Sequence, residues 1–558
     1  MNSEMTGVIV TFIITLLIAF PLGKYIAKVF KGEKTITDFM SPLERFIFRV
    51  SGIDTTKEMN WKQHMAALLC INGVWLIYAF VMLLVQGSLP LNPDANPSMT
   101  PDLAFNTSIS FLVNCNLQHY SGESGLTYLT QLYVITFLQF VSAATGVAAV
   151  AVLFRAFAEK TTEKLGNFFV FFTKTITRIL LPLCIIVAAL LAFNGTPASF
   201  DGKDTIVTLQ GDSVQVSRGP AAGMIAIKHL GTNGGGWFGA NSAHPLENPS
   251  YFTNMVEVIA QVILPMALIF AFGFFIRKKK LGYAIFGVMT LGMLTFMIPT
   301  FFSEMGGNHS FATLGLHDVS AMEGKEVRFG VPASAYWQVM TTIISTGSVN
   351  SMHDSSMPLS GAMQMLGMMT NCFYGGKGVG LLNYFIFLII AVFISGLMVG
   401  RTPEFMGRKV EAREMKIAAM IALFHPFLVL VGTAIAAYYP QAAWGLQPGN
   451  HGFSEMLYEY TSSSANNGSG FEGLGDNNIF WNLTTGIVML LGRFIPIIGP
   501  VAIAGILAKK KYIPESAGTL QTDTATFGIM TYAVIMILAA LAFFPALTLG
   551  PIAEFFQL

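Results

Sequence analysis

Glycine, asparagine and small hydroxyl residues are concentrated in four hairpins, and these residue types suit the binding of a cation through backbone oxygens. We define hairpins 1 to 4 as residues 106–123, 227–248, 341–356 and 458–474. Gly and Asn tolerate backbone conformations that other residues resist, so they can crowd carbonyl oxygens together to replace the water shell of an ion. One such hairpin would mean little, but four at similar spacing predict a ring around a cation path.

The composition predicts that these hairpins lie in a membrane protein. Of the 558 residues, 53% are hydrophobic and only 11% are charged. Several apolar runs exceed the roughly 18 to 20 residues that span a bilayer. The net charge of +1 gives no indication of nucleic-acid binding, and no nucleic-acid motif occurs. The four cysteines have no paired spacing, so neither a disulfide framework nor a metal cluster is indicated.

We expect ten membrane-spanning helices and no cleaved signal peptide. Of the 32 Lys and Arg residues, 23 fall in alternate connections, which the positive-inside rule assigns to the cytoplasm. The N-terminus and all four hairpins are therefore expected outside. The predicted spans are 5–27, 63–87, 127–154, 165–193, 251–276, 281–302, 381–400, 415–438, 479–506 and 525–548.

Each hairpin has to enter the membrane and return, because the spans on either side of it run in opposite directions. Non-helical backbone at membrane depth is tolerated where it is buried in protein or lines a wet cavity, so the hairpins predict one central path. The predicted fold class is an all-α polytopic membrane protein with four pseudosymmetric helix–re-entrant pore loop–helix units in one chain. We expect an extra helix and cytoplasmic loop in 1–62, pore units in 63–158, 159–276, 277–413 and 414–511, and a last helix in 512–558.

A short helix is predicted before each hairpin, at 101–113, 221–231, 333–345 and 454–464. The carboxyl end of each helix would point inward, where its partial negative charge favours a cation. In residues 205–217, alternation around a glycine turn predicts a small β-hairpin.

Four acidic residues near the hairpins have two open interpretations. They are Glu123, Glu247, Asp354 and Glu472. A ring of carboxylates at an outer mouth would concentrate cations. Alternatively, each acid caps a helix or ties a loop, and the sequence leaves both possibilities open.

Arg493 lies well inside the predicted span 479–506. A charge at this depth normally faces a cavity or a partner, and a positive charge beneath a cation site would oppose straight passage. Packing against helix ends is the alternative. Lys174, Arg178 and Glu257 lie near predicted membrane edges, where we expect them to snorkel. His425, before a proline, is expected to be a satisfied core residue.

The seventh span is interrupted. Residues 357–374 have a helical pattern, and Gly375, Gly376, Gly378 and Gly380 then break it around Lys377. A broken helix at membrane depth is typical of gates and binding paths. The alternative is a glycine elbow that packing requires.

Long motifs in this chain resemble the potassium-binding subunit of the Kdp-type potassium-transporting ATPase. They are TNGGGWFGANSAHPLENP (232–249), MEGKEVRFG (322–330), GRTPEFMGRKVEAREMK (400–416) and HGFSEMLYEYTSSSANNGSGFEGL (451–474), and the resemblance covers essentially the whole chain. It implies a fold similar to the superfamily of potassium transporters, with K⁺ as the bound substrate ion and no other cofactor. It also implies a complex in the bacterial cytoplasmic membrane with three further subunits, which are a P-type ATPase, a single-span protein and a small peptide.

The resemblance assigns three filter residues to each hairpin by their place in the matching motifs. Cys115 departs from the small hydroxyl residue expected at its position, which matters little if its carbonyl alone is used. The resemblance also implies that the loop around Gly375, Gly376, Lys377 and Gly378 blocks a straight channel and directs ions sideways toward the P-type ATPase. The assigned filter residues are Asn114, Cys115 and Asn116; Thr232, Asn233 and Gly234; Ser345, Thr346 and Gly347; and Asn466, Asn467 and Gly468.

The chain lacks the sequence signatures of an ATP-hydrolysing protein. It contains no aspartyl-phosphate signature, and the string GGKGVG at 375–380 lacks the residue that a phosphate-binding loop requires after its lysine. We therefore expect ATP hydrolysis on a partner. One alternative is a self-sufficient potassium channel or secondary transporter of the same superfamily. Another is a membrane scaffold that positions the ATPase while ions pass elsewhere.

Overall fold

The computed structural model describes residues 3–313, 315, 320–398, 400–439, 445–514 and 521–557. Within them, ten helical segments are long and apolar enough to cross a membrane, which confirms the predicted number. Residue 399, inside the predicted span 381–400, lies outside the described residues. The segments are α1 (Ser3–Lys31), α3 (Trp61–Val85), α6 (Tyr128–Thr130) with η3 (Gln131–Thr136) and α7 (Phe137–Ala158), α8 (Phe168–Lys174) with η4 (Thr175–Leu180) and α9 (Leu181–Phe193), α11 (Tyr251–Phe275), α12 (Lys279–Gly306), α16 (Val379–Met398), α17 (Ala412–Tyr438), α19 (Ile479–Lys509) and α20 (Ala525–Leu549).

The helices divide into an inner and an outer set. In the most apolar stretches of α7 and α11, 89% of residues are buried, against 22% in α1 and α3. Both sets are apolar on all sides, because the lipid and the protein interior are both apolar surroundings that favour apolar side chains. Cap residues fix several helix starts: Asn60 and Ser250 complete capping boxes for α3 and α11, and Asn478 accepts from the backbone of Trp481 in α19. The core therefore lies around α7 and α11.

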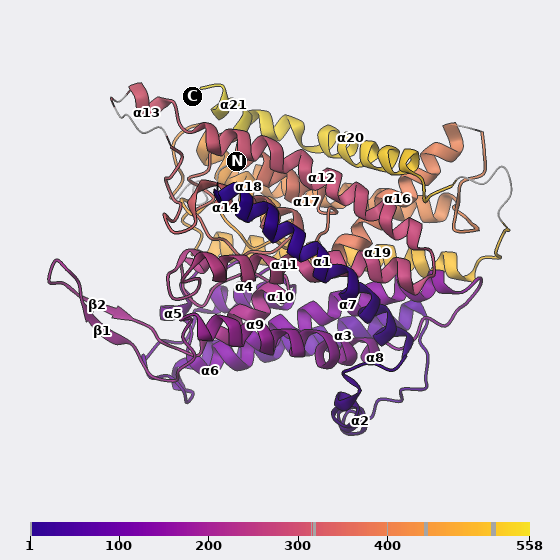
Figure 1. Cartoon of the computed structure of the whole chain (residues 1–558), viewed down its shortest axis with the longest axis horizontal. Coiled ribbons are helices and arrows are strands. Elements are labelled where there is room, and N and C mark those ends of the chain that lie inside the picture. Colours follow the sequence, from indigo (N-terminus) through magenta and orange to yellow (C-terminus); the bar gives the residue numbers. More distant parts are fainter. Residues whose placement is uncertain are drawn as a thin grey trace.

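The two ends of the helix bundle differ in character (Figure 1). Both chain termini and the sheet of β1 (Asp204–Val207) and β2 (Ser213–Val216) lie at the end on the left, which we call the hairpin end. The strands pair antiparallel, Asp204 with Val216, as predicted. The opposite end, called the basic end, carries α2 (Ser41–Val50). The short strands β3 (Glu404–Phe405) and β4 (Arg408–Lys409) follow α16 and pair antiparallel.

Four short buried helices lead into the hairpins: α4 (Pro101–Leu112), α10 (Ala221–Leu230), α14 (Gly330–Ile344) and α18 (Asn450–Ala465). The last two begin earlier than the predicted 333 and 454. Pro332 fits the first turn of α14, where its missing N–H is tolerated. Gly449 precedes α18 with φ +76°, a conformation that starts the helix at Asn450.

The expectation of snorkelling is wrong for Arg178 and Glu257. Arg178 is 8% exposed, and its Nε lies 2.6 Å from Glu44 Oε1. Glu257 is fully buried, and its Oε2 lies 2.9 Å from His229 Nε2. Lys174 keeps partial exposure. A buried charge needs partners, and both side chains have partners close by, so neither has to reach for solvent.

Candidate ion-binding site

Each of the four hairpins leaves its short helix through a residue in the left-handed region. These residues occupy the same position in all four hairpins, and none of them is glycine. A left-handed residue one or two positions after the end of a helix turns the chain sharply, so each hairpin bends back at the carboxyl end of its helix. The residues and their φ angles are Asn114 (64°), Thr232 (46°), Ser345 (58°) and Asn466 (52°).

Side-chain amides join hairpin 1 to hairpin 2. Asn114 donates from Nδ2 to the carbonyl oxygen of Thr232 at 2.7 Å. Asn233 donates from Nδ2 to Asn114 Oδ1 at 2.7 Å, and Asn116 donates to the carbonyl oxygen of Gly234 at 2.8 Å. All five residues are buried. The asparagines therefore fix the positions of neighbouring backbone segments.

Hairpins 2, 3 and 4 are joined in the same order as in the sequence. The backbone N–H of Gly347 donates to the carbonyl oxygen of Asn233 at 3.3 Å, and Gly234 and Gly347 form a parallel bridge. Asn467 donates from Nδ2 to the carbonyl oxygen of Thr341 at 2.9 Å. To close a ring, one further contact is needed, between hairpin 4 and hairpin 1.

Gly468 makes that last step, so the four hairpins form a closed ring. A Cβ added to Gly468 would collide with the carbonyl oxygen of Cys115 and would lie 2.8 Å from its carbonyl carbon. Gly234 and Gly468 have φ of 91° and 99°, where L-residues are strained. Gly347 has no positive φ; an added Cβ there would lie 2.7 Å from the carbonyl oxygen of Asn467. Gly347 is thus required by close approach rather than by its dihedral angles.

The thiol of Cys115 takes no part in the ring. Its side chain is buried in a cluster with Ile109, Val113, Leu117 and Met489. The carbonyl oxygen of Cys115 faces Gly468 instead. This placement agrees with the use of backbone oxygens alone. The structure thus brings all twelve predicted filter residues to one ring, in which all but the half-buried Gly468 are buried. Their role in ion binding remains a prediction.

A cavity of ≈340 Å³ opens above the ring at the hairpin end, with lining residues from all four hairpins. His119 lines it, and its Nε2 lies 3.4 Å from Glu459 Oε1. Burial alone would lower the pKa of His119, but Asp476 and Glu459 outweigh it and raise the pKa to about 9. The predicted filter thus has a polar entrance that contains one titratable cation–carboxylate cluster.

The four acids near the hairpins do not form one ring of solvent-facing carboxylates. Glu123 accepts from the backbone of Gly239, and Glu472 accepts from the backbone of Asp354. Glu247 is fully buried in an ion pair with Lys228. These three acids tie loops, which favours the second of the two interpretations for them, whereas Asp354 Oδ1 lies 2.9 Å from His451 Nε2.

Sequence reasoning missed the buried network behind hairpin 2. Lys228 donates from Nζ to Asn241 Oδ1 (2.7 Å) and Ser242 Oγ (2.9 Å), in addition to its pairing with Glu247. Asn241 donates in turn to the carbonyl oxygen of Gly347 at 3.2 Å. The network therefore supports two hairpins of the ring. Its signal in the sequence was a lysine inside the short helix predicted at 221–231.

The broken seventh span lies beneath the ring. Helix α15 (Pro358–Thr370) ends before the break, and α16 resumes at Val379. The backbone N–H of Lys377 donates to Thr232 Oγ1 at 3.1 Å, and that of Gly375 donates to the carbonyl oxygen of Ile343 at 3.2 Å. An added Cβ at Gly376 would lie 3.7 Å from Thr232 Oγ1. The glycine loop thus packs directly under hairpins 2 and 3.

Two buried cationic side chains accompany this loop. Arg493 is 4% exposed and donates from Nη2 to the carbonyl oxygen of Ser142 at 3.1 Å. Lys377 is fully buried, and among the described residues its Nζ has no hydrogen-bond partner. Both residues meet Gly146 of α7: a Cβ there would lie 3.2 Å from Arg493 Nη2 and would collide with the carbonyl oxygen of Lys377. The predicted barrier residues therefore converge below the ring.

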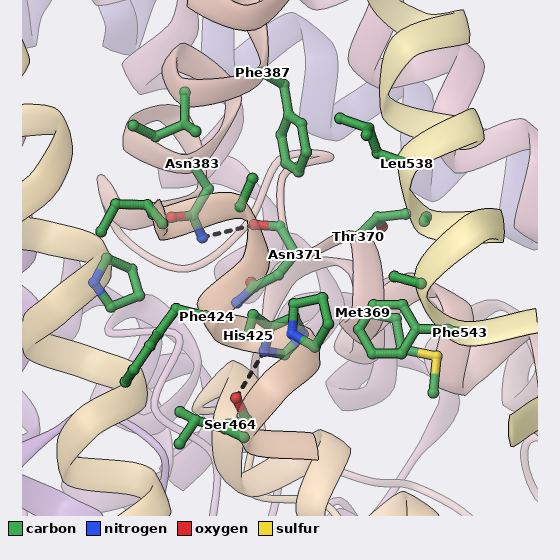
Figure 2. Close-up of a pocket in the computed structure, with 18 of the residues that line it drawn as sticks. Met369, Thr370, Asn371, Asn383, Phe387, Phe424, His425, Ser464, Leu538 and Phe543 are labelled. Carbon is green, nitrogen blue, oxygen red and sulfur yellow. Dashed lines mark hydrogen bonds between the residues drawn. The ribbon is translucent and has the colours of Figure 1, made fainter. Parts of the chain in front are cut away.

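A pocket of ≈60 Å³ lies beside the break (Figure 2). Asn383 donates to the carbonyl oxygen of Asn371 at 2.9 Å, and His425 Nδ1 lies 2.7 Å from Ser464 Oγ. His425 Nε2 lies 3.2 Å from the carbonyl oxygen of Met368, so both ring nitrogens have partners, as expected. The pocket was not predicted, because α16, α17, α19 and α20 contribute to it from distant parts of the chain.

In the described part of the chain, ten apolar helices around a closed ring of hairpins define an all-α polytopic membrane protein. The chain belongs to the family described as the potassium-transporting ATPase A subunit, whose model matches residues 9–556. The predicted resemblance is thereby confirmed.

Curated relatives match along their whole length. The potassium-transporting ATPase potassium-binding subunit of Flavobacterium johnsoniae is 67% identical, with all of both chains covered. Its counterpart from Phocaeicola vulgatus is 59% identical with the same coverage, and that from Alicyclobacillus acidocaldarius is 49% identical over 99% of this chain and 100% of the relative. Among solved structures, the potassium transporter TrkH from Vibrio parahaemolyticus has a TM-score of 0.52 at 14% identity, covering 89% of this chain and 98% of that chain. This likeness concerns the fold alone.

Proposed function

We propose that this chain is the potassium-binding and ion-selecting subunit of an ATP-driven potassium uptake complex. The observation that carries the proposal is the closed ring in which backbone and side-chain contacts join hairpins 1 to 4. The relatives named above as potassium-binding subunits support K⁺ as the ion. Carbonyl oxygens replace the water shell of K⁺ in such a ring, and the carboxyl ends of α4, α10, α14 and α18 add favourable potential.

The proposed path starts at the cavity of ≈340 Å³ and continues through the ring. Below the ring, the glycine loop and the charges of Arg493 and Lys377 oppose straight passage. In this proposal, ions then leave the ring sideways, through the pocket of ≈60 Å³ that lies beside the break. The hairpin end faces the outside, and the basic end faces the cytoplasm of the bacterial inner membrane.

The same proposal includes the partners and the internal organisation of the chain. A P-type ATPase partner hydrolyses ATP, and a single-span protein with a small peptide completes the complex. The four hairpins belong to four pseudosymmetric pore units, flanked by the extra helices α1 and α20. The relatives' names support membership in an ATPase complex.

Potassium binding to the purified complex tests the filter. Replacing Asn114, which fixes hairpin 1 against hairpin 2, by alanine is expected to weaken binding, because a buried hydrogen-bonding partner is left unsatisfied. Asn194 is the matched control, because it is an asparagine at the end of α9 outside the ring. Equal potassium affinity in both variants and in the wild type would contradict the proposal that the ring binds potassium.

A self-sufficient channel or secondary transporter is the second candidate, because the chain carries no ATP-hydrolysis signature and a pore of four hairpins does not itself require ATP. Flux measurements in liposomes separate the two functions. The uptake-complex proposal predicts that the chain alone is tight to K⁺ and that flux needs the ATPase partner and ATP. Passive potassium flux through the chain alone would establish the second candidate, and a chain that binds no K⁺ would leave a scaffold role.

A further inference from the structure

Metal-ligating side chains meet at the hairpin end, outside the ring. Asp354 comes from hairpin 3, and His451 and Glu455 come from one face of α18, four residues apart. One ligand atom from each of the three residues lies within 4.8 Å of those of the other two. The spacing is that of side chains arranged around one ion.

Glu455 supplies an independent indication of a ligand. It is fully buried, and one carboxylate oxygen, Oε2, accepts from the backbone of Gln447 at 2.8 Å. The other, Oε1, has no hydrogen-bond partner among the described residues. A Cβ added to Gly473 would collide with this Oε1 and lie 2.7 Å from Asp354 Oδ2, so the two carboxylates face the same small space. A buried carboxylate oxygen without a partner is unfavourable unless a cation or a proton joins it.

We propose that Asp354, His451 and Glu455 bind one zinc ion. One imidazole nitrogen with carboxylate oxygens is a donor set that suits Zn²⁺, whereas Mg²⁺ and Ca²⁺ prefer oxygen alone. His451 Nε2 lies 2.9 Å from Asp354 Oδ1. Ligand atoms about 2.0 to 2.2 Å from a tetrahedral zinc are about 3.3 Å apart, so a small rotation of the side chains admits the ion.

Glu554 of α21 (Pro551–Phe555) orients the histidine for this role. Its Oε1 lies 2.9 Å from His451 Nδ1, so the carboxylate accepts that N–H and leaves Nε2 for the metal. A carboxylate behind a ligating histidine is the usual second partner in zinc sites. An open cavity of ≈410 Å³ reaches Asp354, His451 and Glu554 and gives the ion a route in. A bound zinc ion would link hairpin 3, α18 and, through His451, α21.

Zinc binding to the chelator-stripped complex tests the site, with Zn²⁺ titrated against a chromophoric chelator. The wild type is expected to bind one zinc ion per chain, with X-ray absorption showing one imidazole and oxygen ligands. Glu455→Gln and His451→Gln are expected to abolish this binding, and Glu554→Gln to weaken it about 10- to 100-fold. Glu455→Gln keeps both contacts of His451, and its unfolding temperature without zinc shows whether it is folded.

His309→Gln is the control, because His309 is an exposed histidine outside the proposed ligand set. It is expected to bind zinc as the wild type does. The proposal is overturned if the wild type binds no zinc, if a folded Glu455→Gln binds it with unchanged affinity, or if His309→Gln is the variant that loses it.

Discussion

Replacing Gly468 by alanine is expected to weaken potassium binding about 5- to 150-fold. Gly468 has φ 99°, and an L-residue held there is strained by about 1 to 3 kcal/mol. If the strain is relieved only by distorting the ring, the free energy of potassium binding becomes less favourable by the same amount. A loss of 1 to 3 kcal/mol corresponds to about 5- to 150-fold in affinity. The added Cβ would lie 2.8 Å from the carbonyl carbon of Cys115, where ordinary contacts are 3.4–4 Å. The carbonyl group of Cys115 therefore has to move, and selectivity between K⁺ and Na⁺ should change with it.

Gly223→Ala provides the matched control within a short helix of the same kind. Gly223 lies in α10, and an added Cβ there meets nothing within 4 Å. Alanine is favoured over glycine inside a helix, so this variant should bind K⁺ normally. Calorimetric titration of the assembled complexes with K⁺ and Na⁺ measures both effects, and gel filtration checks assembly. Wild-type affinity and selectivity in an assembled Gly468→Ala complex would refute the reasoning.

Three further perturbations examine the barrier and the entrance. Arg493→Met should uncouple transport from ATP hydrolysis. The K⁺ affinity should change by less than about tenfold, or 1.4 kcal/mol, because the guanidinium contacts Ser142 rather than a carbonyl oxygen of the proposed filter. Fully coupled transport in liposomes would contradict this expectation. Deleting residues 375–378 should permit selective K⁺ flux without ATP, and a correctly inserted deletion that stays tight would favour the packing elbow. His119 has a pKa raised from 6.5 to about 9, so its stabilising charge is present below pH 6.5 and lost as pH rises through 9. The unfolding temperature of the wild type should therefore fall more between pH 7 and 10 than that of His119→Gln, and parallel curves would argue against this role.

The ring could be predicted because its signals are local. Small polar residues after short apolar helices mark each turn, and Asn114, Thr232, Ser345 and Asn466 all adopt the left-handed conformation there. Local patterns could not show whether a glycine is required for its dihedral angles or for the close approach of another backbone segment. Gly234 and Gly468 are needed for their dihedral angles, whereas Gly347 is needed because the backbone of hairpin 4 lies against it.

The support around the ring was harder to predict because it depends on distant partners. Lys228 finds Glu247 and Asn241 only after hairpin 2 has folded back on its helix. Arg178 finds Glu44 across more than 130 residues, which is why a membrane-edge position suggested snorkelling instead. Pairings of this kind are set by tertiary packing, so they cannot be predicted from hydropathy or residue spacing.

If the ring selects the ion as proposed, its construction from four different hairpins of one chain has a consequence for how that selectivity can evolve. In a homotetrameric channel, one codon change alters every quadrant at once, so most changes are drastic. Here a substitution at Asn116 changes one hairpin and leaves the residues at Gly234, Gly347 and Gly468 as they are. Its direct effect is limited to near neighbours such as the carbonyl oxygen of Gly234, which accepts from Asn116. With the proposed filter role, ion preference can therefore drift in small, separate steps, and each hairpin can acquire different support, such as the Lys228 network behind hairpin 2.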